Sequence, residues 1–155
     1  AGSRRLKQGD LLLLDFGAEY ENYASDITRM FALGRSSKHQ KEMYKMVYEA
    51  KELSHAEAYA GNAAKNLFLA SENFLTPRGH PLIHSIGHGL GLRVHDFPTR
   101  MGADAEWQLE EGMVVTIEPG AYDAKWGGIR IEDDVLIEGK GHKRLTKAPK
   151  QLVEL

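Results

Sequence analysis

The amino-acid sequence predicts an α+β fold with a mainly antiparallel, curved sheet and flanking helices. Three observations predict it: an early pair of strand-like segments, two segments of helical periodicity after them, and two further strand-like segments towards the C-terminus. The chain has 155 residues without a low-complexity tract or a clear internal repeat. We therefore expect one domain that is large enough to bury a core.

The first pair of strands is expected to form a hairpin. Leu11–Phe16 is an apolar run that follows a Gly-Asp turn signal, which predicts a buried strand. Residues 17–21 can turn the chain. Residues 23–31 are rich in β-branched and aromatic residues, which is typical of a return strand.

Two helices are predicted next. Ser37 and Gln40 have the spacing of a capping box, which predicts that a helix begins at residue 38. Apolar residues then recur at helical spacing to about residue 58: Met43, Met46, Val47, Ala50 and Leu53. A second helix is expected over residues 62–74, before Pro77, Gly79 and Pro81 break the pattern.

The remaining chain is rich in glycine and histidine before it returns to strands. Four of the seven histidines lie within 16 residues, at His80, His84, His88 and His95. Strands are predicted over residues 113–118 and 128–138, and Pro119 with Gly120 ends the first of them.

Composition excludes several classes of protein. A net charge of −2 and a pI near 6.4 argue against a nucleic-acid-binding surface that covers the whole chain. Without cysteine there is no disulfide framework, thiolate metal site or cysteine nucleophile. The longest apolar run, residues 11–14, is far shorter than a membrane span, and no signal-peptide pattern opens the chain. We expect a cytoplasmic protein without a membrane partner.

Five residues stand where an ordinary strand or loop would not place them. Each alone has a plainer explanation, because an Asp at a strand end is usually a turn residue and a His between glycines is usually structural. Together they suggest a common site. Four are carboxylates on predicted strands and one is an imidazole in the Gly-rich loop: Asp15, Asp26, Glu118, Glu132 and His88.

Metal ions are the simplest partners for such a set. A buried carboxylate is costly unless it is paired or bound to a cation, and four carboxylates cannot all stabilise one another. Oxygen-rich sites with one imidazole suit Mn, Fe, Co or Zn. Four carboxylates can neutralise two divalent ions, which would activate a shared water as the nucleophile.

The local contexts of these residues resemble a known family. The resemblance runs from about Arg5 to the C-terminus and rests on four segments in order: Asp15 with Asp26-Ile-Thr-Arg29, His84 with His88-Gly-x-Gly91 and His95-Asp96, Thr116-Ile-Glu118-Pro-Gly120, and Gly128-Ile-Arg130-Ile-Glu132-Asp133. They are similar to the dinuclear metallopeptidases of the pita-bread fold. Within these, the Xaa-Pro aminopeptidases and Xaa-Pro dipeptidases (prolidases) are the most similar.

The resemblance implies a metal-ligand set. Asp26 and Glu132 would bridge two divalent ions, manganese first, with cobalt, zinc or iron as alternatives. Asp15 would complete the shell of one ion, and His88 with Glu118 that of the other.

The resemblance also implies catalytic roles and a substrate. Glu118 would move the proton of the attacking water, and His95 would stabilise the attacked carbonyl. His84 would line the substrate pocket, and Arg130 would hold a metal-binding carboxylate or the substrate. The substrate would be a peptide with proline at its second position.

Two alternatives stay open at this point. A methionine-type aminopeptidase shares the ligand order, although the sequence around Glu132 favours the proline-specific branch. A non-catalytic peptide-binding module would keep the fold, although the complete ligand set argues against it. The family's catalytic domain starts well before its first metal ligand. We therefore expect residues 1–155 to be a single partial catalytic domain, truncated at its N-terminus, of a protein that forms a homodimer at full length.

Overall fold

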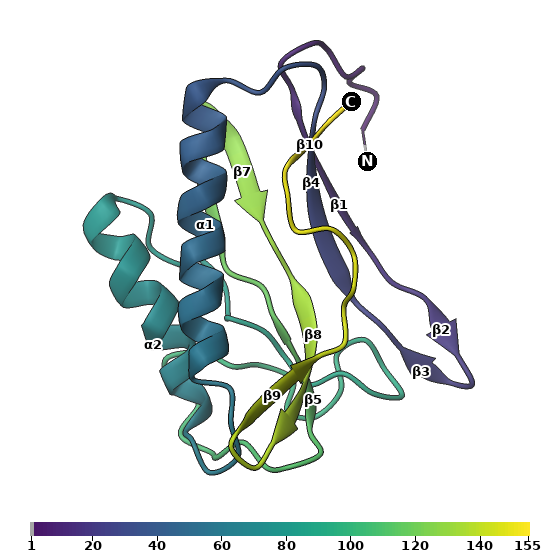
Figure 1. The fold of residues 1–155 in the computed structure, drawn as a ribbon, viewed down its shortest axis with the longest axis vertical. Coiled ribbons are helices and arrows are strands. Elements are labelled where there is room, and N and C mark those ends of the chain that lie inside the picture. The colour runs from purple at the N-terminus through teal and green to yellow at the C-terminus, as the bar shows by residue number, and fades with distance from the viewer. Residues whose placement is uncertain (1) are drawn as a thin grey trace.

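In the computed structural model, which describes residues 2–155, the strands form four small sheets and two helices lie side by side (Figure 1). Strand β1 (Leu11–Phe16) runs antiparallel to β4 (Ile27–Ala32), and this pairing confirms the predicted hairpin. Strand β10 (Val153–Glu154) lies on the other side of β4 and runs parallel to it. The first and last strands therefore lie in one sheet.

The return strand differs from its prediction. Residues 23–31 are not one strand but β3 (Tyr23–Ala24) and β4, with Ser25 and Asp26 between them. Strand β2 (Glu19–Tyr20) occupies part of the predicted turn and pairs with β3. The turn itself is made by Glu21 and Asn22, which adopt φ values of 49° and 68°.

A close backbone approach explains the interruption. A Cβ atom on Gly17 would lie 1.8 Å from the carbonyl oxygen of Ser25, so only glycine lets the two segments come this close. The Ser25 hydroxyl accepts a hydrogen bond from the backbone N–H of Ala18 at 3.0 Å. These contacts hold Ser25 and Asp26 outside the regular ladder, which leaves the Asp26 side chain free to enter the site described below.

Helix α1 (Lys38–Ala56) and helix α2 (Ala64–Leu75) agree with the predicted ranges to within two residues. The Ser37 side chain accepts from the Gln40 N–H at 3.1 Å, and the Gln40 side chain accepts from the Ser37 N–H at 2.8 Å. The capping box is thus confirmed. A short 3₁₀ helix, Thr76–Arg78, follows α2. Among the residues that the structure describes, no helix is long and apolar enough to cross a membrane.

We expect Ser37→Ala to lower the free energy of unfolding by about 1 kcal/mol. The substitution removes the side-chain acceptor for one N–H at the start of α1. Urea unfolding followed by circular dichroism measures the change. Ser3→Ala, at an exposed position outside helices and strands, is the control and should leave the midpoint unchanged.

The C-terminal strands form a second group. Strand β5 (Val114–Ile117) pairs antiparallel with β8 (Asp133–Glu138), which pairs with β9 (Gly141–Arg144). Strand β6 (Gly120–Asp123) pairs antiparallel with β7 (Gly127–Arg130). The predicted strand 113–118 is confirmed as β5, whereas β6, β9 and β10 were not predicted.

The prediction of one strand over residues 128–138 is wrong. Strand β7 ends at Arg130 and β8 begins at Asp133, with Ile131 and Glu132 between them. The backbone N–H of Ile131 donates to the carbonyl of Pro119 at 3.4 Å, and that of Glu132 donates to the carbonyl of Thr28 at 3.3 Å. This segment therefore leaves the ladder and joins the C-terminal strands to β4.

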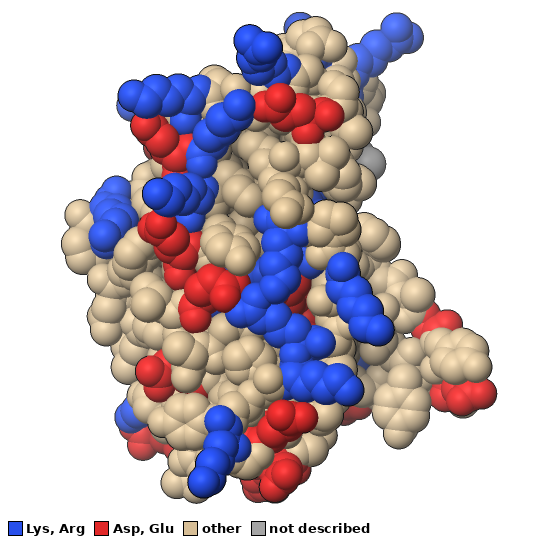
Figure 2. Space-filling model, viewed as in Figure 1, with Lys and Arg blue, Asp and Glu red and all other residues tan. Residues whose placement is uncertain are grey.

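Two apolar clusters fill the space around this junction. One packs Met43 and Val47 of α1 against Met30, Ile129 and Ile131. The other lies between α2 and the β5–β8 pair and includes Leu67, Ile117 and Val135. On the face drawn in Figure 2, basic and acidic side chains are mixed, and basic ones gather most over the C-terminal segment that Figure 1 draws in yellow.

Candidate metal centre

Two carboxylates come from adjacent ends of the β5–β8 pair. Ile117 on β5 lies opposite Asp133 on β8. Glu118 follows directly after β5, and Glu132 stands directly before β8. Antiparallel pairing therefore brings these two acidic residues to the same end of the ladder.

The other two carboxylates come from the first hairpin. Phe16 lies opposite Ile27, so Asp15 at the end of β1 and Asp26 just before β4 are near neighbours. The backbone N–H of Asp26 donates to the Asp134 carboxylate at 3.1 Å. The hydroxyl of Thr28 donates to Glu132 Oε2 at 2.6 Å, which ties the hairpin to the C-terminal strands.

His88 reaches the site from the glycine-rich loop. Its carbonyl accepts from the N–H of Thr116, and Gly89 forms an isolated bridge with Val115, so β5 holds this part of the loop. Atom Nδ1 of the His88 ring lies 3.0 Å from the carbonyl of Gly89. That contact favours a proton on Nδ1 and leaves Nε2 as an acceptor or a metal ligand.

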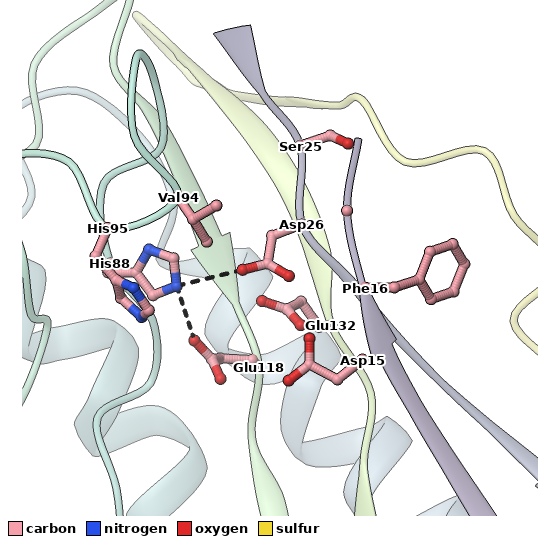
Figure 3. A pocket seen from close by; sticks show the side chains of 10 residues that line it. Asp15, Phe16, Ser25, Asp26, His88, Val94, His95, Glu118 and Glu132 are labelled. Atoms are coloured by element: carbon pink, nitrogen blue, oxygen red, sulfur yellow. Dashed lines mark ion pairs between the residues drawn. The ribbon is translucent and has the colours of Figure 1, made fainter. Parts of the chain in front are cut away.

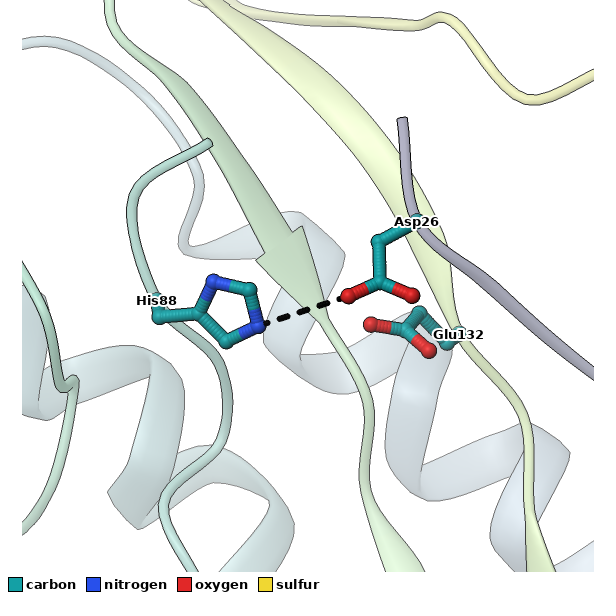
Figure 4. Close-up of side chains that lie close together, drawn as sticks. All are labelled: Asp26, His88 and Glu132. Carbon is teal, nitrogen blue, oxygen red and sulfur yellow. Dashed lines mark ion pairs between the residues drawn. The ribbon is translucent and has the colours of Figure 1, made fainter. Parts of the chain in front are cut away.

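All five predicted ligands line one cavity of about 260 Å³ (Figure 3). His88 Nε2 lies 3.7 Å from Asp26 Oδ2 and 3.5 Å from Glu118 Oε1. Ligand atoms of Asp26, His88 and Glu132 all lie within 4.8 Å of one another, and Figure 4 shows their side chains turned towards a common point. The five side chains are thus brought together, although their roles as ligands stay a prediction.

Burial disfavours the ionised form of the carboxyl groups that line the cavity. It raises the pKa of Glu132 to about 9, with a further contribution from the nearby Glu118 carboxylate. Burial also raises the pKa of Glu118 and of Asp26, and Asp15 adds to the effect on Asp26. A divalent cation would relieve this cost, and carboxylate oxygens with one imidazole are the donors that Mn, Fe, Co and Zn accept. The residues present therefore fit such an ion.

Arg130 lies beside this carboxylate group. Its guanidinium forms an ion pair with Asp15, and its Nε lies 3.7 Å from Glu118 Oε2. The same Nε donates to the Thr28 hydroxyl at 3.2 Å. Arg130 thus contacts two of the predicted ligands, which is compatible with its predicted role of holding a carboxylate in place.

The two predicted catalytic histidines lie in different surroundings. The His95 ring packs against His88, with 4.1 Å between ring centroids, and lines the cavity. His84 is not among the residues that line it. Its Nε2 instead lies 2.9 Å from the hydroxyl of Tyr122, which also accepts from Arg130. The roles of both histidines stay predictions.

Sequence reasoning missed three hydroxyl residues around the site. Thr28 on β4 stands two residues after Asp26, and Thr116 on β5 stands two residues before Glu118; their hydroxyls contact Glu132 and Glu118. Alternation along a strand was the available signal, since residues two apart face the same side. Tyr122 had no such signal, because β6 was not predicted.

Comparison with known proteins identifies the family. The sequence model of metallopeptidase family M24 matches residues 1–139. The chain belongs to this family. The Xaa-Pro dipeptidase of Pyrococcus horikoshii is 44% identical over 155 residues, and the match covers 99% of this chain and 44% of that protein.

Solved structures support the same assignment. The X-Pro aminopeptidase of Thermotoga maritima superposes with a TM-score of 0.96 at 38% identity, over 100% of this chain and 44% of that one. The prolidase of Pyrococcus furiosus gives a TM-score of 0.91 at 44% identity, over 96% of this chain and 44% of that one. The predicted pita-bread fold is confirmed. The chain thus spans 44% of the length of each similar protein named here.

Proposed function

We propose that the protein to which this chain belongs is a metal-dependent peptidase that hydrolyses the bond between an N-terminal residue and a following proline. One observation carries the proposal: four carboxylates and an imidazole line one small cavity. The names of the similar proteins, Xaa-Pro dipeptidase, prolidase and X-Pro aminopeptidase, supply the substrate class.

The proposed cofactor is a pair of divalent ions, with manganese the first candidate and cobalt, zinc or iron as alternatives. Asp26 and Glu132, which Figure 3 shows between His88 and Asp15, would be shared by the two ions. Asp15 would hold one of them, and His88 with Glu118 the other. When bound, the ions would polarise the scissile carbonyl and make a water acidic enough to attack it near neutral pH.

The surrounding residues have separate tasks in this proposal. Glu118 accepts the proton of the attacking water, and the Thr116 hydroxyl at 3.2 Å orients its carboxylate. His95, which lines the cavity, stabilises the charge that develops on the carbonyl oxygen. Arg130 keeps Asp15 and Glu118 in place from the side. His84, which lies outside the cavity beside Tyr122, would line the part of the substrate pocket next to it.

The proposal extends to the whole protein. We propose that residues 1–155 form part of one catalytic domain, that the full-length protein is a cytoplasmic homodimer, and that its substrate is a proline-containing peptide.

Side-by-side hydrolysis tests the proposed function. The full protein, loaded with Mn²⁺, Co²⁺ or Zn²⁺, should cleave Xaa-Pro peptides and leave Met-Ala peptides nearly intact, with about two ions per chain by elemental analysis. Asp26→Asn should abolish cleavage because it removes a ligand shared by both ions. The matched control is Asp104→Asn, whose side chain is 75% exposed and which should behave as wild type.

Two other outcomes would replace the proposal. Preference for Met-Ala peptides would make the protein a methionine-type aminopeptidase. Absence of both metal and cleavage after reconstitution would favour a non-catalytic peptide-binding module.

A further inference from the structure

A cluster of buried charges lies behind Glu132, on the side away from the cavity. Lys51 of helix α1 and Asp133 are fully buried, and Arg29 is 5% exposed. Lys51 Nζ lies 2.5 Å from Asp133 Oδ2, and Arg29 Nη2 lies 2.7 Å from Asp133 Oδ1. One carboxylate therefore holds two cations inside the protein.

This cluster is joined directly to the backbone of a predicted metal ligand. Arg29 Nη1 donates to the carbonyl oxygen of Glu132 at 2.5 Å and to that of Thr28 at 3.0 Å. Thr28 in turn donates its hydroxyl to the Glu132 carboxylate. Glu132 is therefore held at two points. Arg29 of the charged cluster binds its peptide carbonyl, and Thr28 binds its carboxylate.

The local chain geometry places the two neighbouring acids in different surroundings. Side chains of successive residues in extended chain point to opposite faces. Glu132 accordingly lines the cavity, whereas Asp133 meets Lys51 of α1. One peptide unit thus joins a side chain that meets Lys51 to a side chain that lines the cavity.

A fully buried lysine is unusual at this place. The buried face of α1 around it also carries Val47, Ala50, Ser54 and His55, and His55 Nε2 lies 3.6 Å from the same Asp133 oxygen. Lysine is almost never fully buried unless it is paired, and an apolar residue of similar volume would fill the same space without loss of solvation. Packing alone therefore does not account for Lys51.

We propose that Lys51 is a positioning residue for metal binding: its ammonium holds Asp133, and thereby keeps the Glu132 carboxylate directed into the cavity. This inference rests on the proposed function, because it treats Glu132 as a metal ligand. Lys51 itself touches neither metal nor substrate. It acts from helix α1 through Asp133 and the Glu132 peptide.

Metal titration of the full protein tests the inference. Lys51→Met keeps the volume and removes the charge, and calorimetric titration with Mn²⁺ alone should give a Kd that is weaker by about 10–100-fold. The visible absorption spectrum of the Co²⁺-loaded variant should also change, because the geometry around the ion changes. Lys51→Gln keeps a hydrogen-bond donor at this position and serves as the second variant if Lys51→Met does not fold. It should give an intermediate Kd.

A stability control separates positioning from simple destabilisation. Val47→Ala removes fully buried apolar volume from the same helix and leaves the charges of Lys51 and Asp133 unchanged. It should lower the melting temperature, and because the Lys51–Asp133 pair is kept it should leave the Mn²⁺ Kd and the Co²⁺ spectrum at wild-type values. If the Lys51 variants keep the wild-type Kd and spectrum, this inference is overturned and the proposed function is not. A wild-type protein that binds no metal would overturn the proposed function and the inference together.

Discussion

Replacing Glu118 with glutamine is expected to lower kcat on an Xaa-Pro peptide by about 10²–10⁴-fold. Glutamine has the same shape and can still contact the Thr116 hydroxyl, so the fold should be kept. It cannot accept a proton from the attacking water. Steady-state kinetics at saturating Mn²⁺ measures the loss, and metal titration should show only a modest decrease in affinity.

The matched control for this variant is Glu110→Gln. Glu110 is an exposed acid shortly before β5, eight positions upstream of Glu118 in the same part of the chain. Its substitution changes the net charge by the same amount and should leave kcat unchanged. Full activity in Glu118→Gln, with metal bound, would remove Glu118 from the mechanism.

The metal-free protein is expected to lose stability as the pH rises from 7 to 9. Glu132 keeps its proton in the native state up to a pKa of about 9, whereas the unfolded chain releases it near 4.5. The contribution of protonated Glu132 to the free energy of unfolding is complete below pH 4.5 and is lost as the pH rises through 9. Each pH unit in this window costs at most about 1.4 kcal/mol, so the total is at most about 3 kcal/mol.

Urea unfolding in chelator at several pH values measures this slope. The range is chosen above the ordinary pKa of histidine, because burial lowers the pKa of His55 to about 4 and its effect on stability is complete above 6.5. Glu132→Gln cannot release a proton and should show a flatter slope. Added Mn²⁺ should raise stability most at pH 9, since it binds the ionised site. Equal slopes in wild type and Glu132→Gln would contradict the expectation.

The sequence predicted long, regular elements better than interruptions. The periodicity of residues 38–58 and the capping box at Ser37 are local signals, and α1 follows them. The break at Glu132 had no local signal, because residues 128–138 have continuous strand character. It arises from the contact of Glu132 with Thr28, about a hundred positions earlier in the chain.

The candidate site was predictable where a residue type was out of place. Carboxylates at the ends of apolar strands drew attention to Asp15 and Glu118, and all five predicted ligands line one cavity. Lys51 had no such signal, since a lysine on an amphipathic helix is ordinarily a surface residue. Its burial depends on pairing with Asp133, which is 82 positions later in the sequence.

The four acidic groups come in two pairs, one from the opening hairpin and one from strands that follow residue 113. Neither stretch alone contains all four carboxylates. The candidate site can therefore form only after these distant stretches have docked, and no local turn contains it. Under the proposed function, a partly folded molecule would have no complete site with which to cut peptides.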